Sequence, residues 1–363
     1  MTLGTVSLFA LALLAQQKPA KPKPPTDGSL AIEKRDLASV LTFSKDGKYL
    51  AVMDYRPSSK VFLYDAATFK EVRTLEGLPP CDFNDGHGRG GGRDATLQFS
   101  PDSKLLVALR ALHQFKFFMV WDVATGKVVG KLPTNEYCSD AVGFSRDGKE
   151  IVLEGLDGDT GKFERKLKTW SLENGEISPK PKRDFKFSEL RDIVFDATGA
   201  RIFLMMSERG YQVADPLTGE VLEEVESKIM ARPQFAGVAQ CAELSPNGKL
   251  LAIGSTKWGT SVNGQGRAGL MRVWDLEKKE ILWNLEQPSQ VGYVAFSADG
   301  KLVAANSMGT INIYDVATGK LQRSITGVRG TCNDEPWSPI AFRRDDGWLA
   351  GVDVTGVRLW KPK

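Results

Sequence analysis

The chain has 363 residues, with 48 Lys and Arg against 45 Asp and Glu, so its formal charge is only +3. A domain that binds nucleic acid usually carries a strongly basic surface, so this balance argues against nucleic acid as the main partner. Apolar residues make up 42% and charged residues 26% of the chain, which is typical of a globular protein rather than a disordered or membrane-embedded one. The length allows a large core in one or two domains.

The first 28 residues differ in composition from the rest of the chain. Leu3 to Ala15 form an uncharged apolar run, too short for a membrane-spanning helix, which needs about 20 residues. Its length and its small residues indicate a signal peptide over residues 1–15. No Lys or Arg precedes the run, so an uncleaved anchor or a start further upstream stays open. The Lys- and Pro-rich residues 16–28 read as an extended spacer. We therefore expect an exported protein, periplasmic or extracellular, with no membrane span after signal removal.

A repeated unit occupies the chain from residue 29 onward. Each unit has an apolar strand, a Ser-x-Asp-Gly-Lys turn, a second apolar strand and a later strand ending in Trp or Tyr followed by Asp. Short alternating runs bounded by Gly, Asp, Asn and Pro predict antiparallel strands joined by hairpins, and no sustained helical period follows Pro25. The first strand of each unit ends, at a mean spacing of about 50 residues, in Phe43, Phe99, Phe144, Phe195, Leu244, Phe296 and Phe342.

Over residues 29–363 the chain resembles the WD-repeat β-propeller family. The resemblance rests on the repeated F-S-x-D-G-K and W/Y-D-x-x-T-G-K motifs, with intact pairs at Trp121-Asp122 and Trp274-Asp275. Two features depart from the family pattern: the Gly-His pair survives only at Gly86-His87, and the fourth unit has Ala214 in place of the aromatic. The resemblance implies an all-β, seven-bladed propeller with four-stranded antiparallel blades that serves mainly as an interaction platform.

The two ends of this region predict how the ring closes. The seventh unit ends after three strands, which leaves an open strand edge. Ser29 to Asp36 form a lone strand with no partner before the first unit. Pairing this strand as the fourth of the last blade closes the ring and covers the edge.

The connections between strands differ in length according to the face on which they lie. The turns after the first and third strands, such as residues 44–48 and 65–70 of the first unit, are uniformly short and share what we call the turn face. The other two connections meet on the opposite, loop face, and they are enlarged at Gly77–Asp94, Leu156–Lys166, Gly254–Gly269 and Gly327–Pro339. Loops on a rigid scaffold tolerate insertion and also carry binding function. The candidate binding residues in these loops are Phe83, Asp85, His87, Arg89, Arg93, Trp258, Arg267 and Trp337.

Small-ligand chemistry has two candidate positions on the loop face. The glycines between Gly86 and Gly92, with Arg89 and Arg93, could surround an anion, but the segment lacks the Gly-Lys-Ser/Thr of a P-loop, and a solvated loop is the plainer interpretation. Asp94, Asp140 and Asp192 precede the first strands of units two to four, at the mouth of the predicted channel. Three carboxylates there could hold Ca²⁺, although their unequal offsets favour solvated or capping aspartates. We expect no metal and no other cofactor.

The sequence contains few residues typical of a catalytic site. His87 and His113 are the two histidines, and neither accompanies a nucleophile motif. The four cysteines are Cys81, Cys138, Cys241 and Cys332, and their spacings match no zinc site. The sequence does not decide whether any two of them form a disulfide.

The leading hypothesis is an exported, monomeric, non-enzymatic scaffold that binds a protein or cell-envelope component. A propeller enzyme, such as a lactonase-like hydrolase or a dehydrogenase, and a sensor of small anions are the alternatives.

Overall fold

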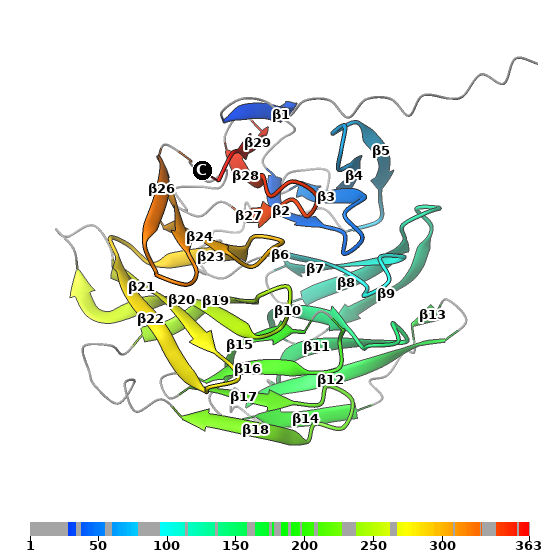
Figure 1. Cartoon of the computed structure of the whole chain (residues 1–363). Coiled ribbons are helices and arrows are strands. Elements are labelled where there is room, and N and C mark those ends of the chain that lie inside the picture. Colours follow the sequence, from blue (N-terminus) through cyan, green and yellow to red (C-terminus); the bar gives the residue numbers. More distant parts are fainter. Residues whose placement is uncertain are drawn as a thin grey trace, which may run out of the picture.

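Seven antiparallel sheets follow one another round a ring in the described part of the computed structural model (Figure 1), six with four strands and one whose outer strand is divided in two. The structure describes residues 28–33, 38–54, 60–78, 95–112, 115–134, 137–157, 164–173, 176–177, 183–187, 190–196, 198–206, 210–226, 237–261, 267–307, 309–326, 328, 339–353 and 356–362. The innermost strands β2, β6, β10, β15, β19, β23 and β27 each contact the next, and β27 contacts β2 again, so the ring is closed. The predicted seven-bladed propeller is confirmed.

The strands agree with the repeat unit in order and pairing. Blade 1 comprises β2 (Ala38–Phe43), β3 (Tyr49–Asp54), β4 (Val61–Asp65) and β5 (Glu71–Leu75), and blade 2 comprises β6 (Ala95–Phe99), β7 (Leu105–Leu112), β8 (Phe115–Asp122) and β9 (Val128–Thr134). Blade 4 comprises β15 (Leu190–Phe195), β16 (Ile202–Met206), β17 (Gly210–Ala214) and β18 (Val221–Glu226). Blade 5 comprises β19 (Gly237–Leu244), β20 (Leu250–Ser261), β21 (Arg267–Asp275) and β22 (Glu280–Gln287), and blade 6 comprises β23 (Val291–Phe296), β24 (Leu302–Ser307), β25 (Thr310–Asp315) and β26 (Leu321–Thr326).

Blade 3 differs from the repeat in its outer strand, which is made of two pieces. Its other strands are β10 (Tyr137–Phe144), β11 (Glu150–Asp157) and β12 (Glu164–Glu173). The short β13 (Glu176–Ile177) pairs with one end of β12, and β14 (Arg183–Phe187) pairs with the other end. Phe185 of β14 packs so closely on Gly219 of blade 4 that no Cβ would fit there. It covers the region beside Ala214, where the fourth unit lacks the aromatic of the repeat.

Blade 7 is closed by the N-terminal strand, as the sequence predicts. Its sheet runs from β27 (Ile340–Phe342) through β28 (Leu349–Asp353) and β29 (Gly356–Trp360) to β1 (Ser29–Glu33). Ser29 pairs with Leu359 and Glu33 with Gly356, so the last strand has no open edge along this stretch. The guanidinium of Arg358 also donates a hydrogen bond to the Gly28 carbonyl.

The core is divided among the seams between blades. The described residues form seven clusters of buried apolar side chains, and each cluster joins two neighbouring blades. Trp121 of blade 2, for example, is fully buried against Met53 and Leu63 of blade 1, and its Nε1 donates to the Glu76 carbonyl at 3.0 Å. Middle strands such as β4 and β24 are therefore buried along almost their whole length, because both of their faces pack against neighbouring blades.

Candidate functional site

The turn face is built from capped turns that repeat round the ring. In blade 3 the buried Ser145 hydroxyl donates to Asp147 Oδ1 at 2.7 Å and accepts the Glu150 N–H at 3.0 Å, while Asp147 Oδ1 accepts the Lys149 N–H at 3.0 Å. The Lys149 N–H and the Ser145 hydroxyl hold the pKa of Asp147 below its usual value. The same bonds recur from Ser44, Ser100, Ser245 and Ser297. The motif Ser-x-Asp-Gly-Lys is therefore a turn-capping device.

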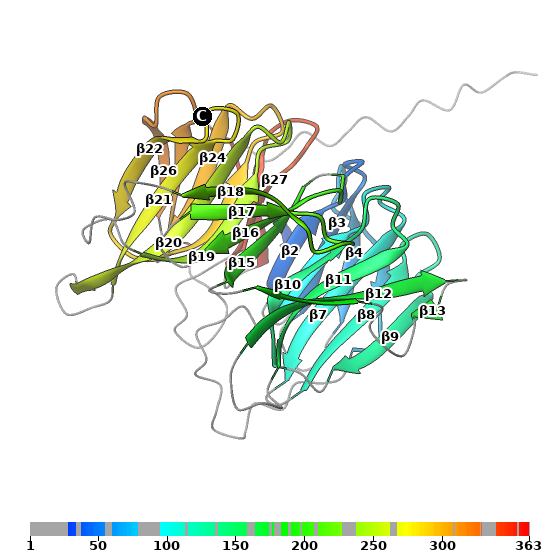
Figure 2. The ribbon, with the colours of Figure 1, turned by 90° about the horizontal axis from the view of Figure 1, so that it is seen from below.

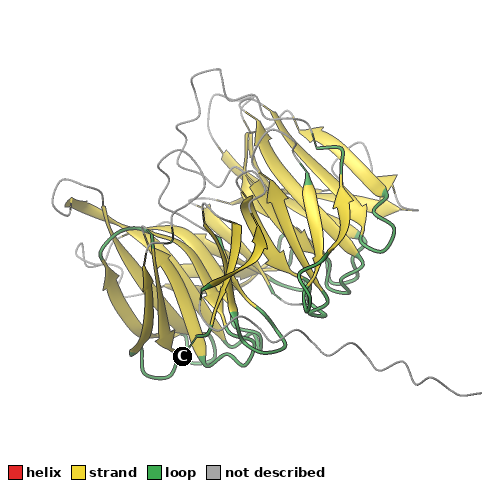
Figure 3. Cartoon of the chain, turned by 90° about the horizontal axis from the view of Figure 1, so that it is seen from above, coloured by secondary structure: helices red, strands yellow, loops and turns green. Residues whose placement is uncertain are grey.

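Backbone hydrogen bonds join the two sets of turns on this face. The Ala66 N–H donates to the Lys48 carbonyl at 2.8 Å, and equivalent bonds reach the carbonyls of Lys104, Lys149, Lys249 and Lys301 in other blades. Most of the described turns gather on one side of the ring (Figure 3). The turn face is thus tied together by backbone and side-chain contacts.

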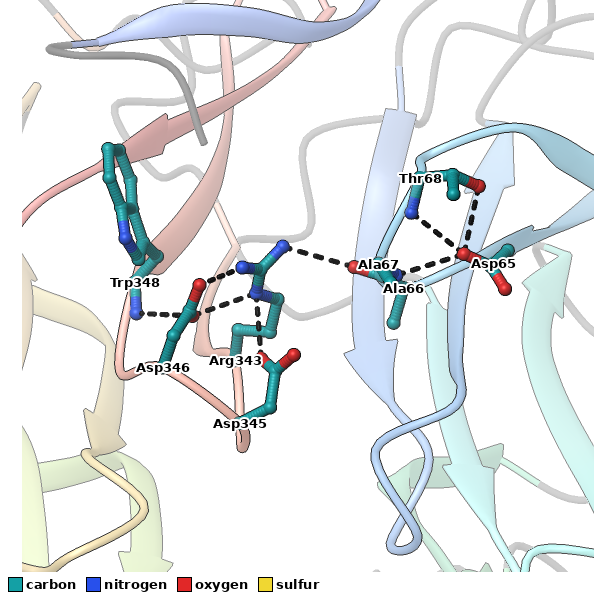
Figure 4. Close-up of polar contacts among 8 residues, drawn as sticks. All are labelled: Asp65, Ala66, Ala67, Thr68, Arg343, Asp345, Asp346 and Trp348. Atoms are coloured by element: carbon teal, nitrogen blue, oxygen red, sulfur yellow. Dashed lines mark hydrogen bonds and ion pairs between the residues drawn. The ribbon is translucent and has the colours of Figure 1, made fainter. Parts of the chain in front are cut away.

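Arg343 takes the place of the capping serine in blade 7 and reaches the neighbouring blade. Its guanidinium pairs with Asp345 at 2.9 Å and with both carboxylate oxygens of Asp346, and it donates to the Ala66 carbonyl of blade 1 at 3.2 Å (Figure 4). The Arg343 side chain is only 6% exposed, so these partners compensate a buried charge.

The central channel contains a cavity of about 260 Å³ at its turn-face end. All seven inner strands or the turns that follow them contribute to its wall. Glu243 of β19 is the carboxylate in this wall, and its Oε2 accepts the Phe296 N–H of blade 6 at 3.1 Å. Burial raises the pKa of Glu243 to about 7, against the opposing effects of the Phe296 N–H, Lys45 and Arg344.

Two cations face the same cavity. Lys45 follows β2 and Arg344 follows β27, so both lie where an inner strand enters its turn. Burial, together with the positive charge of Arg344, lowers the pKa of Lys45. Glu243 and Asp196 act on Lys45 only through longer-range attraction, without a hydrogen bond to it.

Most of the binding residues expected on the loop face lie outside the described residues. These are Phe83, Asp85, His87, Arg89, Arg93 and Trp337, together with Asp94, His113, Cys81 and Cys332. Trp258 and Arg267 are described, and they stand on strands β20 and β21 rather than in a loop. The expectation that residues 254–269 form one long loop was wrong, because both strands continue well past the point where the repeat predicts a turn.

Two of the three channel-mouth aspartates stand on neighbouring inner strands. Asp140 lies in β10, within a register shift between Cys138 and Val142, and Asp192 lies in β15 opposite Met205. Among the described residues, no group of three or more His, Cys, Asp and Glu side chains could hold a metal ion. The calcium hypothesis stays untested at Asp94.

Cys241 is a buried thiol that donates to the Val291 carbonyl at 3.5 Å. Cys138 lies in β10 opposite Gly155. No helix long and apolar enough to cross a membrane occurs in the described part of the chain.

Sequence reasoning missed the charged cavity. The residue before each key apolar position is Thr42, Gln98, Gly143, Val194, Glu243, Ala295 or Ala341, and Glu243 alone among these is charged. That contrast was the available signal. The enlarged connections of the loop face give a stronger pattern in the sequence than this single charged residue does.

The fold and the repeated turn define the class: the chain is a WD-repeat-like seven-bladed β-propeller. No family model matches it. It is similar to the small ribosomal subunit protein RACK1 of Candida albicans (27% identity over 129 residues) and of Schizosaccharomyces pombe (27% over 135 residues). Each match covers 34% of this chain and spans 37% or 38% of the relative's length. Among solved structures, the propeller domain of Cps50 (Swd1) from Myceliophteria thermophila aligns with a TM-score of 0.65 and 16% identity, covering 93% of this chain and 99% of that domain.

Proposed function

We propose that this protein is a non-enzymatic scaffold that binds a protein partner on its loop face. The observation that supports this proposal is the unequal length of the hairpins that end on the loop face. In blade 6 the strands β24 and β25 have six residues each, and two residues separate Ser307 from Thr310. In blade 5, β20 has twelve residues and β21 has nine. Their pairing is regular to Thr256 and Gly269 and, after a register shift, includes Ser261 and Arg267.

Blade 6 shows that a short connection is sufficient for a blade to form. The extension of β20 and β21 is therefore not required for the blade, and the hairpin projects beyond its neighbours (Figure 2). A preorganised hairpin loses little conformational entropy when it binds, which makes it a suitable recognition element. Trp258 and Arg267 belong to residue types that are enriched in binding hot spots, and both stand on this projection.

The comparisons support the same class of function. The curated relatives are named as proteins of the small ribosomal subunit, which places those proteins in a macromolecular assembly. The propeller domain of Cps50 (Swd1) shares its fold with this chain. A role in assembly through surface contacts is consistent with both.

A shortened hairpin tests the proposal. In one variant Asn-Gly replaces residues 257–268, and in a control variant Lys104→Met and Lys301→Met change exposed positions of the turn face. The immobilised proteins capture partners from a cell-envelope extract, and cross-linking with mass spectrometry maps the contact. We expect capture to be lost only from the shortened hairpin. Equal capture by all three proteins, or cross-links confined to the turn face, would contradict the loop-face assignment.

We also propose that the protein is exported and acts as a monomer. The apolar run of residues 3–15 and the Lys- and Pro-rich spacer support export. Mass spectrometry of the N-terminus of protein recovered from the periplasm or medium tests cleavage near residue 15. Light scattering of the purified protein tests the monomer. A cytosolic, full-length chain would refute the export proposal.

A further inference from the structure

The turn-face end of the channel is an unusual place for charged side chains. Its cavity, of about 260 Å³, is walled in part by the apolar Val142, Ile193 and Phe296. Lys45 and Arg344 nevertheless face it from blades 1 and 7, and Glu243 faces it from blade 5. Three charged groups from three blades therefore converge on one small space that is partly open to solvent: Lys45 and Glu243 are half-buried, and Arg344 is exposed at its rim.

The positive charges of Lys45 and Arg344 have no close counter-ion in this cavity. Burial and the like charge of Arg344 both disfavour the charged form of Lys45. Neither Lys45 nor Arg344 makes a hydrogen bond or ion pair with another side chain in the described structure. Arg344 is exposed and keeps its water, whereas Lys45 is half-buried, and a partly desolvated cation without a close counter-ion destabilises a fold unless something compensates its charge.

Glu243 does not supply that compensation. One of its oxygens is occupied by the Phe296 N–H, and its interaction with either cation is longer-range than an ion pair. Because its pKa is raised to about 7, a large fraction of Glu243 is protonated near neutral pH. A protonated carboxyl can donate a hydrogen bond to an anion.

Neutral polar side chains complete the wall. Thr42 and Gln98 occupy the positions in blades 1 and 2 that correspond to Glu243 in blade 5, and Thr96 lies two residues before Gln98. All three belong to residue types that can donate hydrogen bonds to an oxyanion.

We propose that this end of the channel binds a small oxyanion, with Lys45 and Arg344 as its cationic ligands and Glu243 as the group that couples binding to a proton. The cavity is smaller than the 300–1,000 Å³ typical of sites for larger organic ligands, which favours inorganic phosphate or a small carboxylate. Binding neutralises the two cations and favours the protonated carboxyl. Affinity therefore falls as pH rises through the titration of Glu243. This site lies at the end of the channel opposite the surface proposed for the protein partner, so the two proposals stand or fall separately.

The test is a titration of the purified full-length protein with sodium phosphate, sodium sulfate and sodium citrate at constant ionic strength, followed by calorimetry and by Tm. We expect saturable binding of at least one anion, with a matching rise in Tm. Lys45→Met and Arg344→Met should each weaken binding by tenfold or more. Lys104→Met changes a turn lysine whose side chain is 79% exposed, and it should leave binding unchanged.

Two further readouts keep the result interpretable. Lys45→Met removes an uncompensated cation, so its Tm without anion should equal or exceed that of the wild type, which shows that the variant folds. Glu243→Gln keeps an acceptor for the Phe296 N–H. It should make the affinity for sulfate, an anion that does not titrate in this range, independent of pH between 6 and 8. The proposal is overturned if no anion binds saturably, if Lys45→Met binds as the wild type does, or if Lys104→Met weakens binding equally.

Discussion

Arg343 and Glu243 each carry a charge across a seam between blades, but their surroundings differ. Arg343 spans blades 7 and 1 and brings its counter-ions with it, because Asp345 and Asp346 stand on its own turn. Glu243 spans blades 5 and 6 through one hydrogen bond to Phe296, and no cation lies within ion-pairing distance of it in the described structure. Both side chains contact a backbone group of the next blade.

The difference shows when a charged side chain between blades only stabilises the fold and when it can also respond to pH or bind a ligand. A buried charge surrounded by partners contributes to stability only as a set, and removal of one member leaves the others uncompensated. A half-buried charge such as Glu243, with a single backbone partner, is destabilising when ionised, but it can respond to pH or to a ligand. Arg343 belongs to the first kind and Glu243 to the second.

Arg343→Ala removes the side-chain contact between blades 7 and 1 and should have the largest effect on the free energy of unfolding. The change leaves the Ala66 carbonyl and two carboxylates without their donor. Water can solvate these carboxylates, which are 30% and 29% exposed. The lost charge-assisted hydrogen bonds should together cost about 3 kcal/mol. Urea unfolding followed by Trp fluorescence measures the loss. Arg343→Ser is the matched variant, since it restores the serine of the other blades and can cap Asp345 locally. If Arg343→Ser were as stable as the wild type, the contact with blade 1 would not matter.

Glu243→Gln removes the charge from the second seam, and its effect should depend on pH. The pKa of Glu243 in the folded protein is about 7, above the value of about 4.3 for an unfolded chain. The stability associated with the protonated form is therefore fully present below about pH 4.3 and is lost as pH rises through 7. Lys45, Arg344 and Asp196 are the charged groups that act within this cluster. At pH 8 the variant should be more stable than the wild type by about 2–3 kcal/mol, at pH 5 by about 1 kcal/mol or less, and the gain should disappear only below about pH 4. A gain that is the same at both pH values would contradict this assignment.

Sequence reasoning succeeded where the interactions are local. Ser145 contacts Asp147 and Glu150, all within one turn, so the repeated motif shows this turn directly. The closing strand could also be inferred, because a missing fourth strand and an unpaired first strand explain each other. The seam contacts could not be inferred: Arg343 meets Ala66 across 277 positions, and Glu243 meets Phe296 across 53.

Ser145→Ala tests the serine-capped turn, whose hydrogen bonds are local, for comparison with the two contacts between blades. The buried hydroxyl has one donor and one acceptor bond within its turn, and their loss should cost about 1–2 kcal/mol. The lowered pKa of Asp147 stabilises the fold above the unfolded value of about 3.9, and this contribution is lost as pH falls through the folded value. The variant should therefore also lose less stability than the wild type on acidification below pH 4. Ser297→Ala in blade 6 repeats the test, and the two losses should add.

Ser103 offers a neutral seam contact and the smallest expected change. It stands at the glycine position of its turn with a φ of 62°, and its hydroxyl accepts the Asp46 N–H of blade 1 at 3.1 Å. A left-handed backbone conformation costs a non-glycine residue about 1–2 kcal/mol of folding free energy, and glycine avoids this cost. Two effects oppose that gain: glycine increases the conformational entropy of the unfolded chain, and it removes the hydrogen bond to Asp46. Ser103→Gly should therefore change the unfolding free energy by less than about 0.5 kcal/mol, while Ser103→Ala keeps the strain, loses the bond and should cost about 1 kcal/mol. Equal stability of the two variants in urea would mean that the backbone conformation at this position carries no strain, and that the serine is retained for its contact with blade 1 alone.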